Sequence, residues 1–176
     1  RRALLAAARE LAPPERCTGV VYGSGFEGRP ELLSRVSAGR RLFGNAPAVI
    51  GSVRDPSRFF PLLDRLGMRY PEVNPTVPSE LAGWLVKHPG GAGGAQVGYA
   101  DSRPLGKGCY YQRWHPGRTL SALFLADGTR ALLLGINEQW TSSARQDRPF
   151  LYGGAVSDVQ LPEAVESNLR ARLDAP

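Results

Sequence analysis

A lysine followed by a glycine-rich run limits the local structure of this chain more than any other feature. The stretch reads Lys87-His88-Pro89-Gly90-Gly91-Ala92-Gly93-Gly94, after the apolar Trp84-Leu85-Val86. It predicts a strand over 84–87, a glycine loop over 89–94 and a returning strand over 95–99. Glycine lets a backbone approach a ligand closely, and successive amide N–H groups can hold a phosphate oxygen. The run therefore predicts a phosphate site, with a flexible glycine turn in a hairpin as the alternative.

The identity of the residue before the loop strengthens the phosphate interpretation. Of the 22 basic residues in the 176-residue chain, only Lys87 and Lys107 are lysine, so a lysine here departs from a strong preference for arginine. An ammonium group is a compact positive charge with three donors. The pattern is not a P-loop, because that motif places its lysine after the glycines and begins a helix there.

The other segments predict an α/β fold. A helix over 2–12, a strand over 18–22, a helix over 30–38 and a strand over 41–45 indicate a small domain with a parallel sheet, residues 1–53. Residues 54–112 add a helix over 55–66, with Asp55 as N-cap and Pro56 in its first turn, then an extended connection over 71–80 and a strand over 109–114. In residues 113–176 we expect an Asp127-Gly128 hairpin joining 120–125 to 130–134, a strand over 152–156 and a helix over 162–174.

Composition limits the partners. The net charge is +6, but the arginines are scattered and no zinc-finger or RNA-recognition motif is present, so phosphate-bearing small molecules are expected and nucleic acid is not.

Cys17 and Cys109 are expected to be buried free thiols in a reducing cytoplasm. No apolar stretch reaches the roughly 18 residues of a membrane helix, and no secretory leader is visible. The start at Arg1 reads as the middle of a helix, which suggests a trimmed chain. A homo-oligomer is left open.

A second motif follows about 25 residues after the lysine. Tyr110-Tyr111-Gln112-Arg113-Trp114-His115-Pro116-Gly117 predicts an aromatic strand that ends in a turn between two sheets. The backbone at such a turn could meet an adenine edge, and a buried structural strand is the alternative.

These motifs, in this order, resemble the ATP-grasp superfamily from about residue 54 onward, and in particular the ATP-dependent carboligases related to biotin carboxylase. Trp84 to Lys87 with Gly90, Gly91, Gly93 and Gly94 looks like the lysine strand and phosphate loop of that family. Gln112, Arg113, Trp114 and His115 look like its hinge, where a glutamate usually stands in place of Gln112. Leu123 to Gly128 looks like the first hairpin of its second subdomain. Residues 22–27 and 42–45 resemble the small α/β domain that precedes it in many members.

The resemblance implies an ATP-dependent ligase that activates a carboxylate as an acylphosphate for attack by an amine or similar nucleophile. ATP would be bound by Lys87, by the loop glycines Gly90, Gly91, Gly93 and Gly94, and by the hinge residues Gln112, Arg113, Trp114 and His115, with Mg²⁺ as the usual metal. Glu27 and Arg29 are candidates for a substrate site, with a solvated loop preferred for both. A non-catalytic nucleotide-binding or scaffold fragment is the alternative function.

Two departures from the family pattern stand out. Pro56 occupies the position of an early phosphate-binding lysine, so Arg54 or Arg58 would have to substitute, although a helix-surface position is preferred for each. The chain reaches Pro176 before the late strand whose Glu and Asn usually hold magnesium. Asn74-Pro75 lies in the wrong place for that role, and Asn137-Glu138 is expected to be structural or substrate-facing. No metal ligand is therefore nominated.

Overall fold

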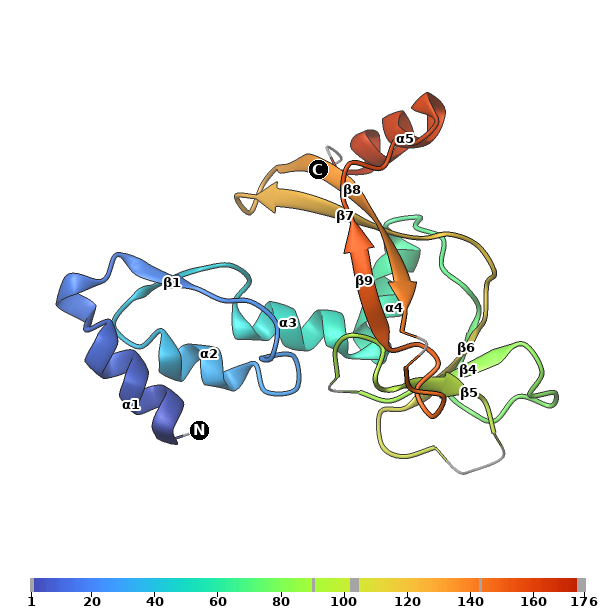
Figure 1. Ribbon diagram of the computed structural model, residues 1–176, viewed down its shortest axis with the longest axis horizontal. Coiled ribbons are helices and arrows are strands. Elements are labelled where there is room, and N and C mark those ends of the chain that lie inside the picture. Colours follow the sequence, from blue (N-terminus) through green and yellow to red (C-terminus); the bar gives the residue numbers. More distant parts are fainter. Residues whose placement is uncertain (1, 90, 102–104, 143, 174–176) are drawn as a thin grey trace. The chain divides into compact units, whose positions relative to one another are not determined.

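The structure is a computed structural model that describes residues 2–89, 91–101, 105–142 and 144–173. The chain forms two compact units, Arg1–Trp114 and His115–Pro176 (Figure 1). The first contains α1 Arg2–Leu11, a 3-10 turn Pro14–Arg16, β1 Gly19–Val21, α2 Glu31–Val36, β2 Arg41–Phe43, α3 Pro47–Arg54, α4 Pro56–Arg65, β3 Val73–Asn74, β4 Trp84–Lys87, β5 Val97–Tyr99 and β6 Tyr110–Arg113. The second contains β7 Thr119–Ala126, β8 Ala131–Thr141, β9 Tyr152–Val156 and α5 Glu163–Leu173. This mixture of helices and sheets confirms the predicted α/β class.

The first part of the chain forms the predicted parallel strand pair. Val20 of β1 lies opposite Leu42 of β2, and α2 connects the two strands through a crossover (Figure 1). Leu33 and Val36 of α2 are buried. The Arg40 guanidinium donates hydrogen bonds to the carbonyls of Ala8, Ala12 and Val36, at 2.8, 2.6 and 2.6 Å. One arginine therefore satisfies carbonyls near the C-terminal ends of both α1 and α2.

Two consecutive helices lead from this strand pair to the next sheet. The sequence did not predict α3, because Val49, Ile50 and Val53 are β-branched and Gly51 weakens a helix. Asp55 ends α3 and begins α4, where its carboxylate accepts a 3.0 Å hydrogen bond from the Ser57 N–H, as expected for an N-cap. Asp55 is thus the single residue between the two helices, and the chain turns there.

A four-stranded sheet in the order β3-β6-β4-β5 carries the predicted lysine strand. Its pairings are antiparallel, and Lys87 lies opposite Tyr110 of β6 and Val97 of β5. The core includes Trp84 and Tyr111, of which Tyr111 is fully buried. The ring of Phe60 in α4 meets the Tyr110 ring edge-on at a centroid distance of 5.5 Å, so α4 packs on the face that carries Lys87.

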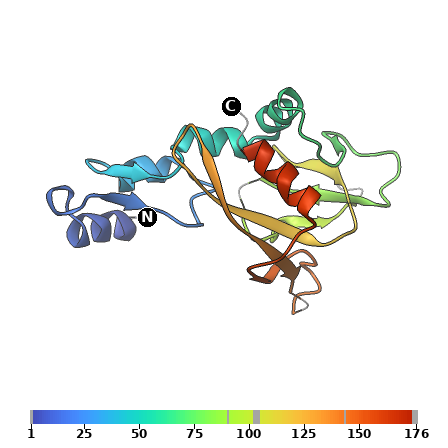
Figure 2. The same cartoon turned by 90° about the horizontal axis from the view of Figure 1, so that it is seen from above.

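The second unit is a three-stranded antiparallel sheet, β7-β8-β9, with α5 after it. Asp127 and Gly128 form the predicted hairpin turn, and β7 and β8 make a long, twisted ribbon (Figure 2). β8 runs to Thr141, well beyond the predicted end at Leu134, because pairing to strands on both sides carries it past Gly135 and its polar neighbours. Within the described part of the chain, no helix has the length and apolar character needed to span a membrane.

Candidate functional site

A cavity of about 360 Å³ lies at the end of β4 in the first unit. Its lining includes Lys87, Gly91, Gly93 and Gly94, so the structure brings the predicted lysine and glycine loop together. The His88 N–H donates to the Gln96 carbonyl at 3.0 Å and closes the loop. Gly93 and Gly94 have φ of +64° and +73°, a backbone conformation that side chains disfavour. The predicted Gly90 lies outside the described residues.

The charge in this cavity is positive. Among the described residues, no carboxylate lines it, and the half-buried Lys87 ammonium has no hydrogen-bond or ion-pair partner. Burial lowers the pKa of Lys87 below its ordinary value of 10.5. Burial also raises the pKa of the neighbouring Tyr110, an effect that the Arg54 charge opposes. An anion in this cavity would compensate the desolvated ammonium, so the arrangement fits a phosphate group.

Arg54 supplies a second cation to the cavity. The Arg54 side chain is half-buried, and its guanidinium Nη2 donates to the Gly91 carbonyl of the glycine loop. The prediction that Arg54 lies on a helix surface is therefore wrong. Arg58, one turn later, is exposed and donates to the Ser52 hydroxyl at 3.1 Å. Of the two arginines that could substitute for the early lysine, only Arg54 lines the cavity among the described contacts.

The predicted hinge residues Gln112 and Arg113 lie further along β6, away from the end of β4 that holds Lys87, and Trp114 follows the strand. The Arg113 guanidinium lies 4.3 Å above the Trp84 ring and 3.7 Å from a Glu72 carboxylate oxygen. The backbone N–H groups of Arg113 and Trp114 each donate within the unit, at 2.8 Å. These two N–H groups are therefore already used. His115 is exposed and begins the second unit.

A second, larger cavity of about 830 Å³ adjoins the first in the same unit. The two share Arg54, Pro56, Pro89, Gly108 and Tyr110 in their linings. The candidate Glu27 lines the second cavity, whereas Arg29 is exposed and is not among the lining residues. Asn74 and Pro75, which lie in the wrong part of the sequence for the magnesium-binding motif of the family, also line this cavity.

Lys107, Cys109 and Tyr110 were not predicted as site residues. Lys107 and Cys109 line the second cavity, and the Cys109 thiol lies 3.1 Å from His88 Nδ1. The rarity of lysine in the sequence was the one signal that could have identified Lys107. Both cysteines are free, as expected, but half-buried rather than fully buried.

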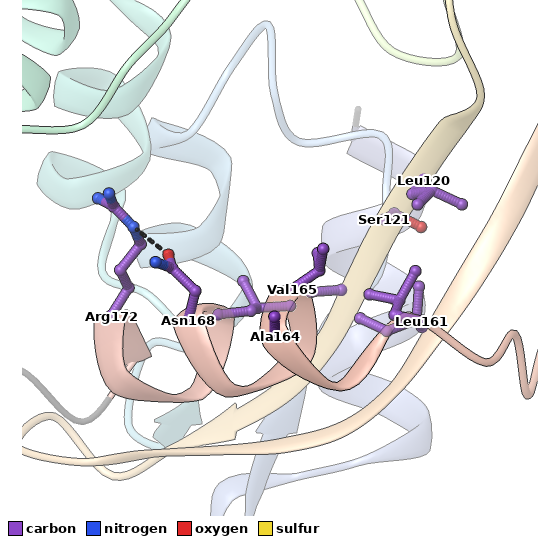
Figure 3. Close-up of a pocket in the computed structure, with 10 residues that line it drawn as sticks. Leu120, Ser121, Leu161, Ala164, Val165, Asn168 and Arg172 are labelled. Carbon is purple, nitrogen blue, oxygen red and sulfur yellow. Dashed lines mark hydrogen bonds between the residues drawn. The ribbon is translucent and has the colours of Figure 1, made fainter.

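The second unit contains an apolar cavity of about 540 Å³ between α5 and the strands β7 and β8. In Figure 3, Ala164 and Val165 of α5 and Leu161 before it line this space, with Leu120 and Ser121 from β7. Arg172 contributes a charge but donates to Asn168 at 2.9 Å. Asn137 lies in β8, where Glu138 forms a bidentate pair with Arg118 at 3.0 and 2.7 Å. The pair with Arg118 gives Glu138 the structural role that was one of its two predicted roles.

The described residues contain no cluster of metal-binding side chains. No group of three or more His, Cys, Asp or Glu side chains in those residues could hold an ion.

Comparisons with known proteins identify the fold. A family model described as an ATP-grasp domain matches residues 54–172. A structure assigned to the ATP-grasp superfamily, from Archaeoglobus fulgidus, aligns with a TM-score of 0.61 at 19% identity, over 82% of this chain and 44% of that one. An L-amino acid ligase from Bacillus licheniformis aligns with a TM-score of 0.66 at 16% identity, over 96% of this chain and 43% of that one.

This chain thus spans less than half the length of either solved structure. No curated protein matches it. The match covers the lysine strand, the glycine loop, the hinge strand and the hairpin, on which the predicted resemblance rested. The chain belongs to the ATP-grasp domain family.

Proposed function

We propose that this chain supplies the phosphate-binding part of an ATP site in an ATP-dependent ligase. The observation that carries the proposal is the half-buried Lys87 ammonium, which lines a cavity with Arg54 and the glycine loop and has no partner among the described residues. A desolvated cation without a counter-charge favours an anionic ligand. Lys87 would donate to phosphate oxygens as a point charge, and Arg54 would offer the donors that its contact with Gly91 leaves.

The reaction we propose is carboxylate activation. A carboxylate oxygen attacks the γ-phosphorus of ATP, ADP leaves, and an amine or similar nucleophile then displaces phosphate from the acylphosphate. The chain's residues would contribute positioning and charge neutralisation, which dominate phosphoryl transfer. Magnesium is usual in the family, but the described residues contain no group of three or more possible ligands, and no step here depends on it. The backbone from Gln112 to His115 is our proposed adenine contact.

The test compares nucleotides that differ only in phosphate. Lys87→Ala should weaken ATP binding to this chain by about 10- to 150-fold, because a charge-assisted hydrogen bond contributes roughly 1.5–3 kcal/mol. Adenosine affinity should stay unchanged, and Lys87→Arg should restore ATP binding only in part, since a planar fork replaces a compact charge.

Calorimetry at fixed salt and magnesium measures these affinities. Arg58→Ala, which removes an exposed cation that lines neither cavity among the described contacts, is the matched control and should bind ATP as the unmodified chain does. Equal ATP affinity for Lys87→Ala and the unmodified chain, or no ATP binding by either, would overturn the proposal.

A further inference from the structure

The second cavity lies where a substrate of the proposed reaction must bind. It shares Arg54, Pro56 and Tyr110 with the phosphate cavity, so a ligand in one lies beside a ligand in the other. Attack on a γ-phosphate requires the attacking oxygen and the phosphorus to approach within about 3–3.5 Å. Two adjoining cavities that share a cation are compatible with that requirement.

The uncompensated charge in the second cavity is positive. Two carboxylates line it, but both have donors: Glu27 accepts from the Gly25 N–H at 2.6 Å, and Asp55 accepts from the Ser57 N–H and hydroxyl at 3.0 and 2.6 Å. The Lys107 side chain is exposed at the cavity wall, and its ammonium has no partner among the described residues. Arg54 directs one nitrogen to the Gly91 carbonyl and keeps further donors. The cavity therefore favours a negatively charged group.

The remaining walls are mostly apolar. They are formed by Phe60 and Pro61 of α4, Val73 and Pro75 near β3, and Tyr110 of β6. A volume of about 830 Å³ is within the range of cavities that enclose a ligand with a sizeable body. A small acid such as acetate would leave these aromatic and aliphatic surfaces in contact with water, which is unfavourable.

We propose that this cavity binds the carboxylate substrate, and that the substrate is an acid with an aromatic or aliphatic body. Its carboxylate pairs with Lys107 and Arg54, and its body packs on Phe60, Val73 and Tyr110. The inference rests on the proposed function. In the reaction, the carboxylate oxygen forms a bond to the γ-phosphorus, the bond from that phosphorus to the β,γ-bridging oxygen breaks, and ADP leaves with the electron pair.

The two cysteines give a direct measurement of ligand preference. Cys109 lines the cavity, whereas Cys17, whose thiol donates to the Gly19 carbonyl at 3.1 Å, does not and serves as the internal control. Each thiolate attacks the CH₂ carbon of iodoacetate or iodoacetamide and expels iodide. We expect the iodoacetate-to-iodoacetamide rate ratio to be about fivefold higher at Cys109 than at Cys17, as one nearby cation predicts. Lys107→Met should remove that difference.

A protection experiment tests the apolar walls. At equal concentration, 3-phenylpropanoate should slow alkylation of Cys109, while acetate and the neutral 3-phenylpropanamide should have little effect. Peptide mass spectrometry follows both cysteines in the same sample. Equal protection by the acid and its amide, or no protection by either, would overturn the inference.

The two lysines separate this inference from the proposed function. Lys87→Ala should lose ATP affinity and keep protection by 3-phenylpropanoate, whereas Lys107→Met should keep ATP affinity and lose protection. Loss of ATP binding in both variants with protection retained in both contradicts the carboxylate site. Protection that depends on Lys107 in a chain that does not bind ATP contradicts only the ATP proposal.

Discussion

Lys87 is held in a position that disfavours its charge. Burial lowers its pKa, so between that lowered pKa and the ordinary 10.5 the unfolded chain binds more protons than the folded chain. Folding stability must therefore rise with pH across this window as far as Lys87 contributes. A ligand phosphate would reverse the shift, because it favours the charged ammonium.

Replacing this lysine should stabilise the protein. Lys87→Met keeps the apolar stem and removes the desolvated charge, so we expect a higher midpoint of thermal unfolding at pH 7 and a gain that shrinks as the pH rises toward 10.5. Lys107→Met removes a charge from an exposed side chain and is the matched control. Thermal unfolding followed by circular dichroism measures both. A lower midpoint for Lys87→Met than for the unmodified chain would contradict the argument.

The glycines of the loop are not equivalent. A Cβ at Gly91 would overlap the far end of the Gln96 side chain, which can move, and no positive φ is required there. Gly94 has a φ of +73° that an alanine rarely adopts. We expect Gly94→Ala to lower the free energy of unfolding by about 1–2 kcal/mol and Gly91→Ala to lower it less. Urea unfolding gives the comparison, and a larger loss for Gly91→Ala would show that Gln96 is fixed.

Among the secondary-structure elements, the β7–β8 hairpin has a turn stabilised by charge. The Asp127 carboxylate accepts from the Arg130 and Thr129 N–H groups, each at 2.9 Å, and from the Thr129 hydroxyl at 2.8 Å. The backbone N–H of Arg130, then that of Thr129, lower the pKa of Asp127 from 3.8 to about 2. The turn is thus stabilised fully above pH 3.8 and loses this contribution as the pH falls through about 2.

A titration of Asp127 by carbon-detected NMR should have its midpoint near pH 2. Thr129→Val removes the hydroxyl donor while leaving the N–H, so its midpoint should lie between that of the unmodified chain and the ordinary value. A midpoint of 3.8 in a chain that circular dichroism shows to be folded would contradict the hydrogen-bonding explanation.

Local patterns predicted some elements well and others not at all. The Asp127-Gly128 turn, the Asp55 N-cap and the lysine strand depend on neighbouring residues, and each forms as the sequence indicates. Helix α3 was missed because its β-branched residues and glycine disfavour a helix locally, and contacts with α2 and α4 compensate. Arg54 could not be assigned because its contact with Gly91 spans 37 positions and requires that helix.

At the scale of the whole molecule, the two units differ in how well they bury apolar side chains. The first buries Leu33, Trp84 and Tyr111 among others, whereas in the second the buried apolar side chains of the described residues are Leu133 and Ile136. Residues 1–114 expressed alone should therefore unfold cooperatively, with blue-shifted emission from the buried Trp84. Fluorescence in urea tests this, with Trp114→Phe removing the exposed tryptophan of the same unit. A gradual, non-cooperative loss of signal would contradict it.

Arg54 lines both cavities, and this has a thermodynamic consequence for any two ligands that occupy them. A single guanidinium that contacts two anions couples their affinities. The coupling must be reciprocal: if one ligand changes the affinity for the other by some factor, the second changes the affinity for the first by the same factor. Bound together, the two anions also repel each other across that cation. Arg54 would therefore determine how much the apparent dissociation constant of one substrate changes when the other substrate is bound.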